Sequence, residues 1–160
     1  MKVSILYHSE SGHTKEVGEY IKEGLESVSG IVVKSMSIED VDIHFLNESK
    51  AVIFGTPTYL ANTTWNMKKW LDESHSVNLE GKIGAVYATA NFIWGGAETA
   101  MLTLLNHLMV KGMLLYSGGA ALGMPYIHLG YVSVNGVNNE DRETPKIFGE
   151  RIGKKVKQLF

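Results

Sequence analysis

The sequence predicts an α/β fold in which helices cover both faces of a doubly wound, five-stranded parallel sheet. Short apolar runs alternate with stretches of helical periodicity along the whole chain, which is the pattern of repeated strand–helix–strand units. A length of 160 residues suits one domain with a sizeable core. The chain shows no internal repeat, linker or low-complexity segment. We therefore expect a single domain over residues 1–160.

The first strand and the first helix have the clearest patterns. Residues 3–7 form an apolar run of strand character. Residues 14–28 then follow a helical period, which places several apolar side chains on one face: Val17, Tyr20, Ile21 and Leu25. Gly30 marks the expected end of this helix, because glycine commonly terminates helices.

The alternation continues through the middle of the chain. We expect strands at residues 31–33, 51–55 and 82–89, since each is a short apolar run. The acidic segment 38–46 is compatible with a short helix. Residues 65–73 have helical spacing. These segments supply the central strands and two covering helices.

The last third of the chain contains an interruption. Residues 97–111 are strongly helical, and residues 113–116 form the expected fifth strand. The glycine-rich segment 117–125 is not helical, and a second strand-like run follows at 131–134. We interpret the two runs as one fifth strand split around a surface insertion. Residues 143–159 form the last expected helix.

Composition excludes several classes of protein. The formal net charge is −2 without a basic stripe or polybasic run, so we expect neither nucleic acid nor a membrane surface as a partner. The chain has no cysteine, and its six histidines show no metal-ligand spacing. We therefore expect no metal. The chain begins in a strand and has no apolar stretch of membrane-spanning length, so we expect a cytoplasmic protein.

The loop after the first strand is the most informative segment. It contains three hydroxyl residues with one glycine and one histidine immediately before the helix: Ser9, Ser11, Gly12, His13 and Thr14. Free amide groups and the helix dipole at such a position favour a phosphate. The loop is neither a Walker A loop nor a dinucleotide fingerprint. A serine-rich turn that only caps the helix is the alternative.

This loop resembles the phosphate loop of flavodoxins. The positions that match the family pattern are Ile5, Leu6, Tyr7, Ser9, Gly12 and Thr14. Gly18 departs from the pattern, which has alanine there. The resemblance implies a flavodoxin-like fold with strand order 2-1-3-4-5. It also implies that FMN is the cofactor and that its 5′-phosphate lies in this loop.

The loop after the third strand extends the resemblance. It is similar to the corresponding loop of WrbA-type NAD(P)H:quinone oxidoreductases, which lines the isoalloxazine ring. The resemblance implies cofactor-binding roles for Thr56, Pro57, Thr58, Tyr59 and Asn62. This chain has Ala61 where the WrbA-type pattern has glycine.

The loop after the fourth strand matches WrbA-type chains more loosely. We expect it to contribute to the cofactor site through Thr89, Ala90, Asn91, Phe92, Trp94, Gly95 and Gly96. Large apolar side chains in a loop indicate contact with another surface. Stacking on a flat ligand is one explanation, and packing on a partner subunit in a homo-oligomer is the other. WrbA-type chains have glycines in place of the bulky residues.

Two functions fit these motifs. The first is an FMN-dependent oxidoreductase that takes hydride from NAD(P)H and reduces a quinone or similar acceptor, with Tyr59 at the ring edge and Trp94 walling the substrate pocket. The near-neutral charge favours this enzyme. The alternative is a flavodoxin-type carrier that shuttles single electrons between redox protein partners. Neither needs a catalytic side chain, since the flavin does the chemistry. A flavin-free interaction domain is a third reading.

Overall fold

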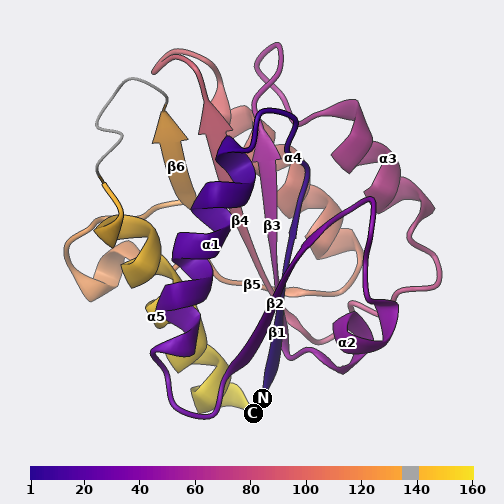
Figure 1. Cartoon of the computed structure of the whole chain (residues 1–160), viewed down its shortest axis with the longest axis vertical. Coiled ribbons are helices and arrows are strands. Elements are labelled where there is room, and N and C mark those ends of the chain that lie inside the picture. The colour runs from indigo at the N-terminus through magenta and orange to yellow at the C-terminus, as the bar shows by residue number, and fades with distance from the viewer. Residues whose placement is uncertain (135–140) are drawn as a thin grey trace.

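The computed structural model describes residues 1–134 and 141–160, and it has the predicted doubly wound architecture (Figure 1). The strands are β1 Lys2–Tyr7, β2 Val32–Ser37, β3 Ala51–Pro57, β4 Ile83–Ala90, β5 Leu114–Leu115 and β6 Tyr131–Val134. The helices are α1 His13–Glu26, α2 Ile43–Glu48, α3 Trp65–Glu73, α4 Ala97–Val110 and α5 Glu143–Leu159, with a 3₁₀ turn at Ala120–Leu122. All pairs of the described strands are parallel, and the order β2-β1-β3-β4-β5 confirms the expected topology.

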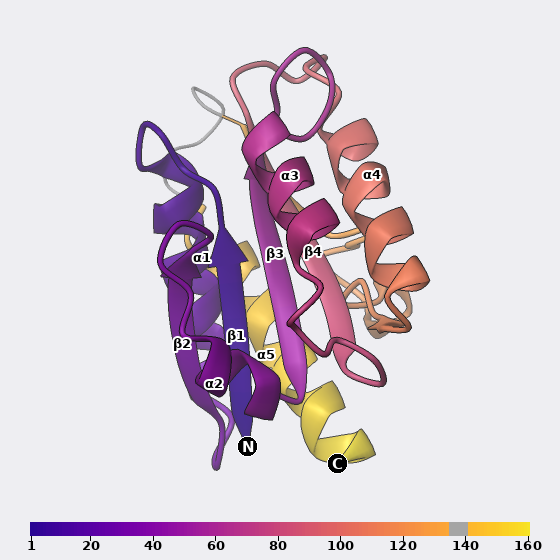
Figure 2. The same ribbon diagram turned by 90° about the vertical axis from the view of Figure 1, so that its right-hand side faces the viewer.

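The helices form one layer on each face of the sheet (Figure 2). Alternate residues of a strand point to opposite faces. In β1, Val3 and Ile5 therefore join the core beneath α1 and α5, whereas Leu6 joins the core beneath α2, α3 and α4. Because both faces are buried, the central strands are almost continuously apolar, as their sequences required.

The fifth strand position is divided between two short strands. β5 pairs with Ile83 and Gly84 at the start of β4, and β6 pairs with residues 87–90 at its end. The chain between them leaves the sheet, as the sequence predicted. Arg151 of α5 is buried and donates hydrogen bonds of 2.9–3.3 Å to five backbone carbonyls of this insertion, those of Gly118, Gly119, Gly123, Met124 and Pro125.

Some boundaries differ from those expected from the sequence. The second strand is longer than predicted, because residues 32–37 pair in register with all of β1. In the acidic segment, the helix begins only at Ile43, where the Asp42 side chain accepts a hydrogen bond from the Phe45 amide and caps it. The first helix ends at Glu26 rather than at residue 28.

Both chain ends lie at the amino-terminal edge of the sheet (Figures 1 and 2). Among the described helices, none is long and apolar enough to cross a membrane. Within residues 1–134 and 141–160, no group of three histidine, aspartate or glutamate side chains is arranged to hold a metal ion.

Candidate functional site

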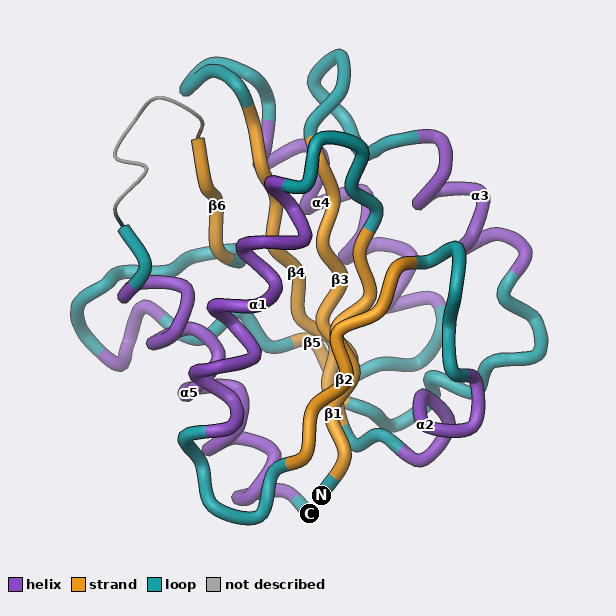
Figure 3. Tube along the Cα trace, viewed as in Figure 1, coloured by secondary structure: helices purple, strands orange, loops and turns teal. Residues whose placement is uncertain are grey.

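Three loops meet at the carboxyl ends of β1, β3 and β4, at the top of the tube in Figure 3. They enclose a cleft of about 270 Å³. Its lining residues come from all three loops: Glu10, Ser11, His13, Thr14, Pro57, Thr58, Tyr59, Thr89, Ala90 and Asn91. This edge lies at the switch point of the sheet, which is where open α/β sheets bind ligands.

The first loop presents unused backbone donors. Gly12 precedes α1 with φ +93°, a conformation that glycine adopts without strain. Within the described residues, the amides from Ser9 to Thr14 donate no hydrogen bond, and the next amide, that of Lys15, donates to Ser9 Oγ at 3.3 Å. Amides at a helix N-terminus favour an anion. The loop therefore fits a phosphate group.

Thr14 connects this loop to β4, two strand positions away in the sheet. Its hydroxyl is 2.8 Å from the Thr89 hydroxyl, and its carbonyl accepts a hydrogen bond of 2.9 Å from the Tyr87 hydroxyl. Thr14 and Thr89 are nearly inaccessible as whole residues, but both contribute to the cleft lining. The first turn of α1 is thus fixed against β4.

Tyr87 also explains why the chain departs from the family pattern at Gly18. A Cβ atom at Gly18 would lie 2.7 Å from the Tyr87 hydroxyl oxygen, closer than real contacts allow. A Cβ at Gly55 would lie 2.0 Å from the ring of the same tyrosine. The fully buried Tyr87 therefore occupies the space that side chains at these two positions would need.

His13 is the first residue of α1, and its Nε2 is 3.0 Å from the Ser133 hydroxyl in β6. His13 is one of the residues that line the cleft. Ser133 was not among the predicted site residues, because it lies 120 positions away in the sequence. Only the pairing of β6 with β4 brings it to this edge.

The second loop contains an unsatisfied hydroxyl group. The Thr58 amide donates to the Thr89 carbonyl at 2.7 Å, but Thr58 Oγ1 is buried and has no partner in the described structure. An unpaired buried hydroxyl is costly. Because Thr58 lines the cleft, a ligand could relieve this cost after a rotation of the side chain. Thr56, by contrast, is fully buried and bonds to Pro57 and Thr63 within its own loop.

A tight hairpin closes the second loop. Tyr59 and Asn62 exchange backbone hydrogen bonds of 2.9 and 3.0 Å, and the two residues between them have positive φ angles, 49° for Leu60 and 60° for Ala61. The Tyr59 hydroxyl donates to Glu10 across the cleft at 3.2 Å. Partial burial, followed by this bond to Glu10, raises the pKa of Tyr59, so the phenol stays neutral at physiological pH.

The third loop divides into two parts. Ala90 and Asn91 line the cleft, whereas Phe92, Ile93 and Trp94 are exposed, Trp94 to 92%. The sequence predicted that Trp94 forms a wall of the substrate pocket. In the structure, Trp94 is not among the residues that line the cleft. Gly96 begins α4 at φ +84°, and a Cβ there would lie 2.6 Å from that of Ala61. The loops after β3 and β4 are thus packed against each other.

The predicted site residues fall into two groups. Those that the structure brings to the cleft are Ser11, His13, Thr14, Pro57, Thr58, Tyr59, Thr89, Ala90 and Asn91. Those outside its lining are Ser9, Gly12, Thr56, Asn62, Phe92, Trp94, Gly95 and Gly96. Several of the second group shape the loops: Ser9 accepts a helix amide, and Asn62 accepts a hydrogen bond from Thr103 of α4 at 2.8 Å. Glu10 lines the cleft and was missed, because an acidic residue is not expected beside a phosphate.

A doubly wound sheet with this cleft at its switch point defines a mononucleotide-binding protein of the flavodoxin-like class. The family model for flavodoxin matches residues 5–112. A flavodoxin from Clostridium saccharobutylicum is 57% identical over 160 residues, which covers all of both chains. An NAD(P)H dehydrogenase (quinone) from Geotalea daltonii is 31% identical, over 81% of this chain and 74% of that protein.

Solved structures show the same fold. A flavodoxin from the domain Archaea has a TM-score of 0.80 at 28% identity, over 98% of this chain and 99% of that one. A WrbA-like flavodoxin from Agrobacterium tumefaciens also has a TM-score of 0.80, at 23% identity and 98% coverage of both chains. This chain belongs to the flavodoxin family, and its cofactor is FMN, as predicted.

Proposed function

We propose that this protein, as one domain over residues 1–160, is a flavodoxin-type carrier that passes single electrons between protein partners. The observation that supports the proposal best is its similarity to a flavodoxin, 57% identical over the full length of both chains. The quinone dehydrogenases found in the same comparison are only 30–31% identical. The carrier, which was the alternative in the sequence analysis, is therefore favoured over the quinone reductase.

Each of the three loops would contact a different part of FMN. The unpaired amides of the first loop, with the hydroxyls of Ser11 and Thr14, would bind the phosphate. Thr58, Tyr59 and Asn91 would contact the ring from the other two loops. When bound, FMN supplies the exchange of electrons one at a time. The chain's own residues bind the cofactor, orient it and exclude water from part of it.

One observation keeps the quinone reductase as a second candidate. A reductase needs space beside the ring for nicotinamide. Phe92, Ile93 and Trp94 are bulky enough to fill that space, but their side chains are exposed and none of them lines the cleft. The described loops therefore do not cover the cleft with these side chains.

An anaerobic titration separates the two functions. The FMN-loaded protein is mixed with NADPH or NADH, and flavin absorbance is followed; free FMN at equal concentration is the control. A carrier should remain oxidised with both nicotinamides, and dithionite should reduce it in two resolved one-electron steps. Bleaching by NADPH or NADH within seconds would instead support the reductase.

A further inference from the structure

The charge balance of the candidate phosphate site depends on one residue. No lysine or arginine is among the residues that line the cleft in the described structure. The ionisable lining groups are Glu10, His13 and Tyr59, and Tyr59 stays neutral because its pKa is raised. A phosphate monoester carries about −1.5 to −2 charges at pH 7, and Glu10 adds another negative charge. His13 is therefore the lining side chain that can become positive.

The surroundings of His13 accommodate both of its protonation states. Its Nε2 is 3.0 Å from the Ser133 hydroxyl. A hydroxyl can donate to the bare nitrogen of a neutral imidazole and accept from the N–H of a protonated one. The contact therefore survives the gain of a proton. A phosphate dianion beside an imidazole ring favours its protonated form, because the opposite charges attract.

We propose that His13 takes up a proton when the FMN phosphate binds and so becomes its counter-charge, with Ser133 as the residue that positions the ring. This inference rests on the phosphate site of the proposed function. It predicts that FMN affinity falls as pH rises above 7. Riboflavin, which lacks the phosphate, should show no such dependence.

Other ionisable residues belong to the segments around His13. They lie on its own loop, on α1, on β6 and at the start of α5: Glu10, Lys15, Glu16, Tyr131, Asp141 and Arg142. Burial, with the charge of Asp141, raises the pKa of Tyr131 to about 12, so it stays neutral. The cleft-lining residues after β3 and β4 bring only Tyr59 as a further ionisable group. His8, at the end of β1, is buried and lies 3.1 Å from the Thr64 hydroxyl, outside the cleft lining.

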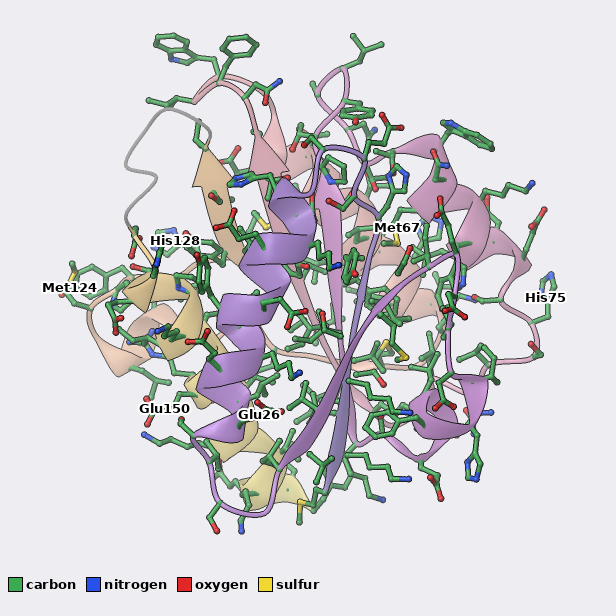
Figure 4. All side chains as sticks on the ribbon, viewed as in Figure 1. Glu26, Met67, His75, Met124, His128 and Glu150 are labelled. Carbon is green, nitrogen blue, oxygen red and sulfur yellow. The ribbon has the colours of Figure 1, made fainter. Side chains whose placement is uncertain are left out.

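The experiment is calorimetric titration of the apoprotein with FMN between pH 7.0 and 8.5, in two buffers of different ionisation heat. In this range the phosphate remains mostly dianionic. The wild type should take up a fraction of a proton at pH 7.0, and its Kd should rise about fivefold by pH 8.5. His13→Gln should remove both the proton uptake and the pH slope. His75→Gln, at an exposed position after α3 (Figure 4), is the matched control and should behave as the wild type.

A second readout does not depend on the Gln variant folding. In NMR titrations of the wild type, the ring signals of His13 should shift their midpoint upward with FMN and stay unchanged with riboflavin. Ser133→Ala should reduce the proton uptake, whereas a role limited to packing would lower stability only. The proposal is overturned if the wild type binds FMN without proton uptake, or if His13→Gln keeps the pH slope. Equal affinity for FMN and riboflavin would instead reject the phosphate site itself.

Discussion

Ser9 and Thr14 lie in the same loop but have different tasks. Ser9 Oγ accepts a hydrogen bond from the Lys15 amide in the first turn of α1, whereas the Thr14 hydroxyl pairs with that of Thr89 beside the cleft. Thr14→Val should weaken FMN binding by about tenfold or more, since a charge-assisted hydrogen bond contributes about 1.5–3 kcal/mol. Ser9→Ala removes the acceptor of the Lys15 amide and should destabilise the apoprotein by about 1 kcal/mol. Calorimetry with FMN and urea unfolding of each apoprotein measure the two effects; FMN affinity equal to wild type in both variants would exclude the loop as the phosphate site.

Gly18 and Tyr87 should be energetically coupled. Alanine is normally better than glycine inside a helix by about 1 kcal/mol. In the wild type, however, Gly18→Ala would press its Cβ against the Tyr87 hydroxyl, and overpacking costs about 1–3 kcal/mol. The substitution should therefore be neutral to destabilising in the wild type and stabilising in a Tyr87→Phe background. A double-mutant cycle from urea unfolding measures the coupling, and strictly additive effects would contradict this packing.

For single residues, the sequence predicted which residue types gather at the cleft. It did not predict which side chains contact one another. Ser9, Ser11 and Thr14 could be placed in a phosphate loop because they lie where the first strand passes directly into a helix. The bond from His13 to Ser133 could not be predicted, since it depends on how a split strand pairs with β4. The same holds for Tyr87, whose alternation in the strand gives its face but not its contact with Gly18.

The hairpin between Tyr59 and Asn62 is the most strained element described at the cleft. Leu60 and Ala61 both have positive φ angles, a conformation that costs about 1–2 kcal/mol for a residue with a Cβ atom. Ala61→Gly should therefore stabilise the apoprotein by up to about 1 kcal/mol. Urea unfolding tests this, and Ala90→Gly, at a buried position of β4, is a control that should be destabilising. A loss of stability in Ala61→Gly would mean that the methyl contact with Gly96 outweighs the strain.

The helices and strands were predictable because the apolar residues in each follow the spacing typical of that element. The central strands and the longer helices are close to their expected ranges. The hairpin was not, because Leu60 and Ala61 are not residues that favour a left-handed turn. Its conformation is fixed by the packing of Ala61 on Gly96, which belongs to another loop. The exposed position of Trp94 has the same origin, since the fold of its loop is set by its neighbours rather than by its own hydrophobicity.

For the whole molecule, Arg151 should control the stability of the insertion. Its guanidinium group bonds to five carbonyls, which would otherwise lose their partner. An ammonium group has three donors and no planar fork, so Arg151→Lys should leave some of these carbonyls unpaired and cost about 2–4 kcal/mol. In this variant, amide hydrogen exchange should become faster in residues 117–127. In β1 and β3, the exchange rates should rise only as much as the loss of global stability requires. Lys154→Arg, on the exposed side of α5, is a control that should be neutral.

The late position of α5 in the chain has a consequence for biosynthesis. α5 contributes Phe148, Ile152 and Val156 to the core on the face that α1 also covers. Ribosomes release the amino-terminal part first, so β1, β3 and β4 emerge while that face still lacks one of its two helices. A nascent chain that ends before α5 therefore exposes apolar surface that chaperones and proteases recognise. Incorporation of FMN should accordingly follow translation, after the carboxyl-terminal helix has docked.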